Sequence, residues 1–250
     1  MTRNTFADHT RRNFMRIAGL AALAIAVRPQ VSLAQTGAAP VKIGMVGSGR
    51  EGGALGKLFA KAGHPVMFSS RHPENLKDLA AAAGPLAQTG TVEQAIAFGD
   101  VIVLGVPYTA VEQIGKDHGS ALARKAVVID VSNPIPRRDG EDFVKSVNAQ
   151  GGAGLVTAKW LPGSHIVRAF NAIGSGRLAD IAHRPGDKVG VPIAGDDPKA
   201  IATAETLIRE IGFEPVLVGG LAMGKHLVPG TPLGGEHTPA EIRQAAAGLR

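Results

Sequence analysis

The chain has 250 residues, contains no cysteine and carries a formal net charge of +6. Without cysteine, disulfides, thiolate catalysis and zinc–thiolate sites are excluded. One tryptophan, one tyrosine and no basic stripe interleaved with aromatic residues argue against a nucleic-acid-binding protein. The length suits one medium-sized domain with short appendages, and the basic charge balance favours an anionic small-molecule ligand.

Residues 1–34 are predicted to be a signal peptide rather than part of the fold. Arg11 and Arg12 precede an apolar run, residues 17–27, that is too short to span a bilayer. Paired arginines in this position are typical of a twin-arginine signal, and Ser32-Leu33-Ala34 offers small residues for cleavage. We therefore expect export to the periplasm by the twin-arginine machinery, no stable membrane span, and a linker over residues 35–40. A disordered basic tail with an amphipathic helix is the alternative.

A glycine-rich turn stands between a predicted strand, residues 41–46, and an amphipathic helix that follows it. Gly47, Gly49 and Gly52 give the spacing Gly-x-Gly-x-x-Gly, which in this context is the dinucleotide-binding fingerprint. The first glycine permits the tight turn, the second lets backbone approach a pyrophosphate, and the third lets the helix pack on the strand. The positive end of the helix then faces the phosphates. We expect the cofactor to be bound by Gly47, Ser48, Gly49, Arg50, Glu51 and Gly52.

The end of the second predicted strand, residues 66–69, indicates which dinucleotide is bound. NAD-dependent folds place an acidic residue here for the ribose 2′-hydroxyl, whereas this chain has Ser70 and Arg71. A guanidinium can hold the 2′-phosphate of NADP in a bidentate manner, so the sequence favours NADP. His72 and Lys77 are weaker candidates for the same phosphate. The alternative is a solvated turn in which the arginine has no role.

The remaining elements follow an alternating strand and helix pattern, with a capping box at Thr91. A helix from Pro73 should end at Gly84-Pro85, and residues 137–140 and 229–235 should be loops. We predict strands over residues 101–104, 126–130, 166–170, 189–194 and 216–218, and helices over residues 92–98, 153–161, 198–211, 221–228 and 239–249. This order predicts an α/β fold, a doubly wound, mostly parallel sheet of the NAD(P)-binding Rossmann type over residues 41–228. A small C-terminal extension, residues 229–250, would follow as a tail.

Candidate site residues follow the predicted strands, at the sheet edge where open α/β folds bind ligands. They are Val106, Pro107, Asn133, Pro134 and Asn171. Tyr108 could stack on a nicotinamide or merely cover its loop, and the Asn133 amide could bind the nicotinamide carboxamide or cap a turn. No catalytic acid or base is convincing, so the catalytic residues stay unknown. The histidines lack metal-ligand spacing, so no metal site is predicted.

Taken together, these motifs resemble the NADP oxidoreductase family that depends on coenzyme F-420, a deazaflavin. The resemblance covers residues 41–229 and is carried by Gly47-Ser48-Gly49-Arg50-Glu51-Gly52-Gly53, Ser70-Arg71, Val106-Pro107, Asp130-Val131-Ser132-Asn133-Pro134, Val167-Arg168-Ala169-Phe170-Asn171, Ala194-Gly195-Asp196-Asp197 and Gly219-Gly220-Leu221. It implies a Rossmann domain that binds NADP along the glycine loop and the Ser-Arg pair. It also implies a deazaflavin against the nicotinamide, near the Asn-Pro and Phe-Asn loops.

The chain departs from this family on the side of the second ligand. Ala172 stands where the family usually has threonine, Gly224-Lys225 replaces an Ala-Arg pair, and Val228 replaces an acidic residue before Pro229. A related module reduces flavin in membrane metalloreductases. Pyrroline-5-carboxylate reductases share the N-terminal half, but their long helical dimer domain does not fit the sequence that follows here.

The main hypothesis is an NADPH-dependent oxidoreductase that transfers hydride between NADP(H) and a deazaflavin or flavin-like acceptor. Val106, Pro107, Asn133 and Asn171 would shape its reaction cleft, and the chain could form a homodimer. One alternative is an exported NADP-binding module without turnover, a partner of another redox protein. The other is a small-molecule carbonyl or imine reductase, whose proton donor would have to be Tyr108, Lys159 or a nearby histidine.

Overall fold

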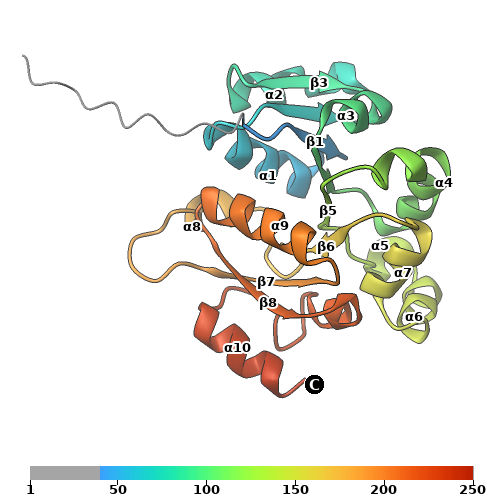
Figure 1. Ribbon diagram of the computed structural model, residues 1–250, viewed down its shortest axis with the longest axis vertical. Coiled ribbons are helices and arrows are strands. Elements are labelled where there is room, and N and C mark those ends of the chain that lie inside the picture. The colour runs from blue at the N-terminus through green and yellow to red at the C-terminus, as the bar shows by residue number, and fades with distance from the viewer. Residues whose placement is uncertain (1–39, 250) are drawn as a thin grey trace, which may run out of the picture. The chain divides into compact units, whose positions relative to one another are not determined.

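The computed structural model describes residues 40–249, so the expected signal peptide and residues 35–39 of the expected linker lie outside the described residues. An eight-stranded sheet forms the centre of this part of the chain (Figure 1). Its strand order is β3-β2-β1-β4-β5-β6-β7-β8. All neighbouring strands are parallel except β6 and β7, which are antiparallel. The prediction of a doubly wound, mostly parallel Rossmann sheet is therefore confirmed.

The strands are short and mostly buried. They are β1 (Ile43–Val46), β2 (Val66–Ser69), β3 (Ala87–Gly90), β4 (Val101–Leu104), β5 (Val127–Asp130), β6 (Ile166–Arg168), β7 (Gly190–Gly195) and β8 (Glu214–Gly219). The α-helices are α1 (Arg50–Lys61), α2 (Lys77–Ala83), α3 (Val92–Phe98), α4 (Val111–Leu122), α5 (Pro136–Asp139), α6 (Glu141–Ala149), α7 (Ala153–Trp160), α8 (Leu178–Ile181), α9 (Pro198–Glu210) and α10 (Pro239–Ala247). Three 3-10 helices, η1 (Pro73–Leu76), η2 (Tyr108–Ala110) and η3 (Leu221–His226), complete the described elements.

Apolar side chains alternate between the two faces of the sheet and give it two hydrophobic layers. On β4, Val101 and Val103 pack with α1 and α9, whereas Ile102 and Leu104 pack with α3, α4 and α7. The continuous apolar run of this strand is explained by burial on both faces. A third cluster joins β7 and β8 to residues 227–246, in which Ile242 of α10 is buried.

Several elements differ from those predicted from the sequence. Residues 137–140, expected to be a loop, belong mostly to α5. The helices α4, α6 and α8 and the strand β3 were not predicted. The helix expected from Pro73 begins as the 3-10 helix η1, and residues 221–226 form 3-10 helix η3 rather than a longer helix. The capping boxes at Thr91 and Thr238 are present with both reciprocal hydrogen bonds. No helix within residues 40–249 is long and apolar enough to span a membrane.

The contact between α1 and β2 gives a stability prediction. A Cβ atom at Gly56 would overlap the ring of Phe68, whereas one at Gly119, in the last turn of α4, would meet open space. We expect Gly56→Ala to lower the free energy of unfolding by about 1–3 kcal/mol through overpacking. Gly119→Ala should instead raise it by about 0.5–1 kcal/mol through helix propensity. Urea unfolding measures both, and equal effects of the two substitutions would contradict the packing described here.

Candidate functional site

A cleft opens at the carboxyl ends of the strands, where the chain order changes direction. β1 pairs with β2 on one side and with β4 on the other, which is the switch point where such folds bind ligands. The cleft has a volume of about 440 Å³ and extends from the glycine loop to the loops after β4, β5 and β6. Seven of the predicted residues line it, namely Gly49, Arg50, Glu51, Val106, Pro107, Asn133 and Asn171.

The glycine loop has the geometry that a dinucleotide requires. Gly47 has φ of +90°, and a Cβ there would lie 2.6 Å from the carbonyl oxygen of Gly105. A Cβ at Gly52 would collide with the carbonyl oxygen of Gly47, so only glycine allows this approach of α1 to β1. At Gly49 a Cβ would meet nothing within 4 Å, and no side chain caps α1. The loop therefore leaves an open cradle at the positive end of a helix, which fits a pyrophosphate.

The predicted 2′-phosphate residues lie beside this loop, outside the cleft. The Ser69 amide donates to Ser48 Oγ at 2.9 Å and thereby ties the end of β2 to the glycine loop. Arg71, two residues after Ser69, is exposed. Ser70 Oγ accepts from the His72 amide, and His72 faces Glu74 at 3.2 Å. Lys77 is exposed at the start of α2.

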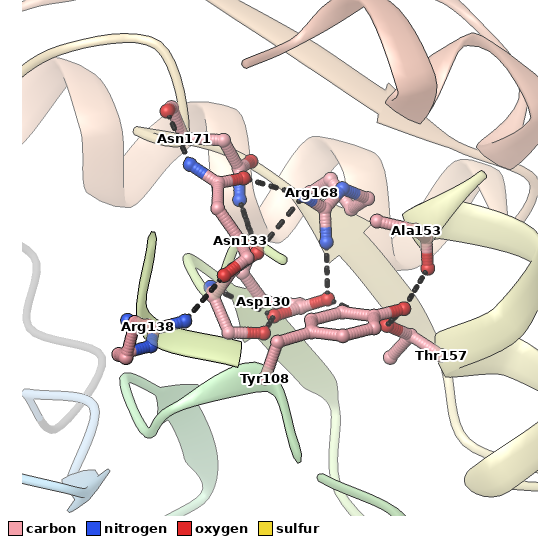
Figure 2. Close-up of polar contacts among 9 residues, drawn as sticks. Tyr108, Asp130, Asn133, Arg138, Ala153, Thr157, Arg168 and Asn171 are labelled. Carbon is pink, nitrogen blue, oxygen red and sulfur yellow. Dashed lines mark hydrogen bonds and ion pairs between the residues drawn. The ribbon is translucent and has the colours of Figure 1, made fainter. Parts of the chain in front are cut away.

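Behind the cleft lies a fully buried ion pair between the last residues of two neighbouring strands (Figure 2). Arg168 Nη1 donates to Asp130 Oδ2 at 2.6 Å, and both side chains are completely buried. Thr157 Oγ1 donates to the same carboxylate oxygen, and the amide and hydroxyl of Ser132 donate to Asp130 Oδ1. The carboxylate is thus supplied with donors from β6, α7 and its own loop, as a buried charge requires.

This network fixes the two asparagines predicted to face the reaction cleft. Arg168 Nη2 donates to Asn133 Oδ1 at 3.0 Å, and Asn133 Nδ2 donates to the Asn171 carbonyl at 2.7 Å. Asn171 Nδ2 donates to the carbonyls of Asp130 and Ser132, which leaves its buried Oδ1 without a hydrogen-bond partner in the described chain. Since both ends of the Asn133 amide contact protein, its predicted contact with a nicotinamide carboxamide would use its second amide hydrogen.

The chain leaves β6 through an unusual backbone conformation. Phe170 is buried in the cleft wall with φ of +61°, a conformation that non-glycine residues adopt rarely. Its ring packs edge-to-face on Phe213, with 5.4 Å between the ring centroids, and this contact holds the turn in place. The turn places Asn171 against β5 and sends residues 173–175 along the cleft.

Glu51, in the first turn of α1, contributes a partly buried carboxyl group to the cleft. Its Oε1 atom is buried without a hydrogen-bond partner in the described residues. Burial raises the pKa of Glu51 to about 7, although the nearby backbone of Ser175 opposes the increase. The carboxyl group of Glu51 is therefore easier to protonate than an exposed glutamate.

The structure excludes two groups that the sequence offered for the cleft. Tyr108 is fully buried and donates from its hydroxyl to the Ala153 carbonyl at 2.7 Å (Figure 2). Its ring lies next to that of Trp160. Because the side chain is fully buried and does not line the cleft, it covers the loop and does not stack on a ligand. Burial also raises the pKa of Tyr108. Lys159 is exposed on α7, contacts Gln150 and does not line the cleft.

Other residues of the site were not predicted from sequence. Arg138 of α5 lines the cleft and donates to the Asn133 carbonyl at 2.6 Å. A second cavity of about 290 Å³ shares Asn133, Ile135 and Pro229 with the cleft. Pro134 and Lys225 line this second cavity, so part of the departure from the resembled family lies here. Within residues 40–249 no three acidic or histidine side chains are grouped to hold a metal ion.

Comparisons with known proteins agree with this geometry. Residues 42–134 match a protein-family model described as NADP oxidoreductase, coenzyme F420-dependent. The matched segment includes the glycine loop, the β2 end and the loops after β4 and β5. The comparisons support an NADP-dependent oxidoreductase.

Two curated relatives resemble most of the chain. Metalloreductase STEAP3 from Rattus norvegicus is 29% identical over 202 residues, which cover 78% of this chain and 37% of the relative. F420-dependent NADP reductase from Methanothermobacter thermautotrophicus is 29% identical over 205 residues, which cover 77% of this chain and 87% of the relative. The chain therefore spans little more than a third of the first relative and most of the second.

The chain also resembles a solved structure in its fold. The hypothetical protein SMa0349 from Sinorhizobium meliloti superposes with a TM-score of 0.66 at 26% identity. The match covers 78% of this chain and 93% of that one, so the shared fold includes more than the segment matched by the family model.

The buried ion pair gives a second prediction. Arg168→Met removes the cation and leaves Asp130 charged and buried, which should cost about 3–5 kcal/mol of unfolding free energy. Adding Asp130→Asn to this variant should restore part of the loss, because the uncompensated charge disappears. Chemical denaturation of the two variants tests the pair, and a double variant no more stable than Arg168→Met would argue against it.

Proposed function

We propose that the chain transfers hydride between NADP(H) and a planar acceptor of the deazaflavin or flavin type. The observation that carries the proposal is the continuity of the cleft, which connects the open glycine loop with the loops after β4, β5 and β6. The volume of about 440 Å³ lies in the range of small-molecule sites. The names of the two curated relatives, a metalloreductase and an F420-dependent NADP reductase, support the same reaction class.

In this proposal each part of the site has a separate task. Bound NADPH would supply the hydride from its nicotinamide ring. The backbone at Gly49 and the first turn of α1 would hold the pyrophosphate, and Ser70 and Arg71 the 2′-phosphate. Hydride transfer depends mainly on positioning, so the rigid loops at Pro107, Asn133 and Asn171 would orient the nicotinamide and the acceptor.

The second cavity bears on the acceptor. Its walls combine apolar side chains with Lys225 and Asn148, and it opens beside Asn133. An acceptor that stacks in the main cleft would extend a substituent into this space. Because the family's Ala-Arg pair is replaced here by Gly224-Lys225, we expect the acceptor's substituent to differ from that of the family's deazaflavin.

A nucleotide-binding module without turnover remains the second candidate. It is favoured by the occupation of both ends of the Asn133 amide by protein groups. NADPH binding without oxidation by any flavin or deazaflavin would distinguish it from the reductase.

The cofactor preference is tested at Arg71. Arg71→Glu removes the cation expected to hold the 2′-phosphate and offers a carboxylate to a 2′-hydroxyl. We expect the ratio of NADPH to NADH affinity to fall by about 10- to 100-fold, the effect of one charge-assisted hydrogen-bonded contact. Fluorescence titration measures both affinities, and the rate of 5-deazariboflavin reduction gives the matching kcat/KM values.

Arg124→Glu is the matched control, because it makes the same charge change at another exposed residue. Arg124 precedes β5 and so lies near the amino-terminal ends of the strands, away from the cleft at their carboxyl ends. It should leave the preference unchanged. An unaltered preference in Arg71→Glu would remove the 2′-phosphate assignment, and failure of the wild-type protein to bind either dinucleotide would remove the proposed function.

We also propose that the protein is exported to the periplasm by the twin-arginine route, which rests on the sequence of residues 10–34 alone. Replacement of Arg11 and Arg12 by lysine should abolish processing and retain the protein in the cytoplasm. Cell fractionation with an immunoblot measures this, and Arg3→Lys is the matched control. Unchanged export of the double-lysine variant would refute the signal assignment.

A further inference from the structure

We propose that Glu51 is the general acid of this cleft and supplies the proton that the acceptor takes up together with the hydride. The inference rests on the proposed function and deepens it, because it assigns a catalytic residue to a reaction for which the sequence offered none. It also defines the acceptor class: a molecule whose reduction leaves a basic nitrogen or oxygen atom beside the nicotinamide.

The position of Glu51 suits a proton donor. Glu51 lies in the wall of the same cleft as Val106, Pro107 and Asn133, and it is the sole acidic residue among those that line it. Its Oε1 atom is buried and makes no hydrogen bond within the described chain. Among the other residues that line the cleft, one has a buried oxygen without a partner, Asn171 Oδ1, and an amide oxygen cannot donate a proton. Tyr108 and Lys159 are excluded by their positions outside the cleft.

The pKa of Glu51 also suits a proton donor. A general acid works best when its pKa is close to the working pH, and burial raises the pKa of Glu51 to about 7. Two charged side chains share the cleft lining with Glu51, Arg50 on α1 and Arg138 on α5. The segment that follows Asn171 carries Arg177 and Asp180. Arg177 is paired with Glu236 at 2.9 Å, and the increase comes from burial rather than from any of these charges.

The proton step is balanced without any further reactant. After hydride transfer, the Glu51 carboxyl O–H bond breaks and a bond forms between that proton and the nitrogen or oxygen that has become anionic. The carboxylate is then protonated again by solvent, for which the open cleft provides access. The acceptor thus gains two electrons and one proton with the hydride and a second proton from Glu51.

The charge of the nicotinamide differs between NADPH and NADP⁺, and this difference fits Glu51 as the proton donor. A neutral Glu51 suits a cleft that holds the uncharged nicotinamide of NADPH. An ionised Glu51 is favoured when the cleft holds the cationic nicotinamide of NADP⁺, because opposite charges at short range stabilise each other. Glu51 should therefore carry more proton in the NADPH complex than in the NADP⁺ complex.

The experiment compares the wild-type protein with Glu51→Gln, which keeps the size and polarity of the side chain. Glu93→Gln, at an exposed position on α3, is the matched control. Calorimetry in buffers of different ionisation enthalpy at pH 7 measures the protons bound or released with NADPH and with NADP⁺. Carbon NMR of protein labelled at the glutamate carboxyl carbon measures the pKa of Glu51 directly. The pH profile of 5-deazariboflavin reduction by NADPH reports the acid itself.

We expect wild-type protein to release up to one more proton per site with NADP⁺ than with NADPH, and Glu51→Gln to show no difference. The wild-type rate should fall tenfold per pH unit above about pH 7, while the Glu51→Gln rate should be 10²- to 10⁴-fold lower and independent of pH in this range. Glu93→Gln should behave as the wild type.

Three results would overturn the inference. One is a Glu51 carboxyl that titrates near its ordinary value, and another is a pH profile unchanged in Glu51→Gln. The third is wild-type protein that binds neither NADPH nor NADP⁺, which would remove the proposed function as well. The first two leave NADPH binding and reduction intact, so failure of the inference is distinguishable from failure of the function.

Discussion

The buried ion pair between Asp130 and Arg168 is the constraint on which the site depends. Both residues end a strand, and the register of β5 and β6 places them side by side. A charge at this depth is tolerated only with a partner and further donors, so the loops after both strands must adopt the conformations that supply them. The same hydrogen bonds that satisfy the pair hold Asn133 and Asn171 (Figure 2). Burial of the charges thus gives the far wall of the cleft its rigidity.

The opposite wall of the cleft forms where the backbone of α1 comes close to that of β1. Gly47 and Gly52 let α1 come against β1, and the loop from Phe170 to Ser175 returns over the start of that helix. The carboxyl of Glu51 is partly buried there, which raises its pKa to about 7. One wall therefore offers fixed amides and the other a titratable group. Such a division suits a reaction in which positioning governs the hydride and a single residue governs the proton.

Much of this arrangement could be predicted from the sequence, and the exceptions have physical reasons. The fingerprint at Gly47 and the apolar strands are local patterns, so the Rossmann sheet and its carboxyl edge follow from them. Strand β3 has no apolar run because it lies at the edge of the sheet, beside β2 alone. The burial of Tyr108 depends on its contact with Ala153, and that of Glu51 on the backbone near Ser175, both distant in sequence. Two neighbouring apolar strands end in an acidic and a basic residue, Asp130 and Arg168. This pattern could have predicted the buried ion pair.

The most direct test of the account is isotopic. NADPH that carries deuterium at the transferred position of the nicotinamide would be mixed with the protein and 5-deazariboflavin, and the product examined by mass spectrometry. The account predicts that the deuterium appears on the reduced deazaflavin, whereas the proton supplied through Glu51 comes from solvent. Tight binding of NADPH with no deuterium in the acceptor, for deazaflavin and for riboflavin alike, would contradict the assignment of this cleft to hydride transfer.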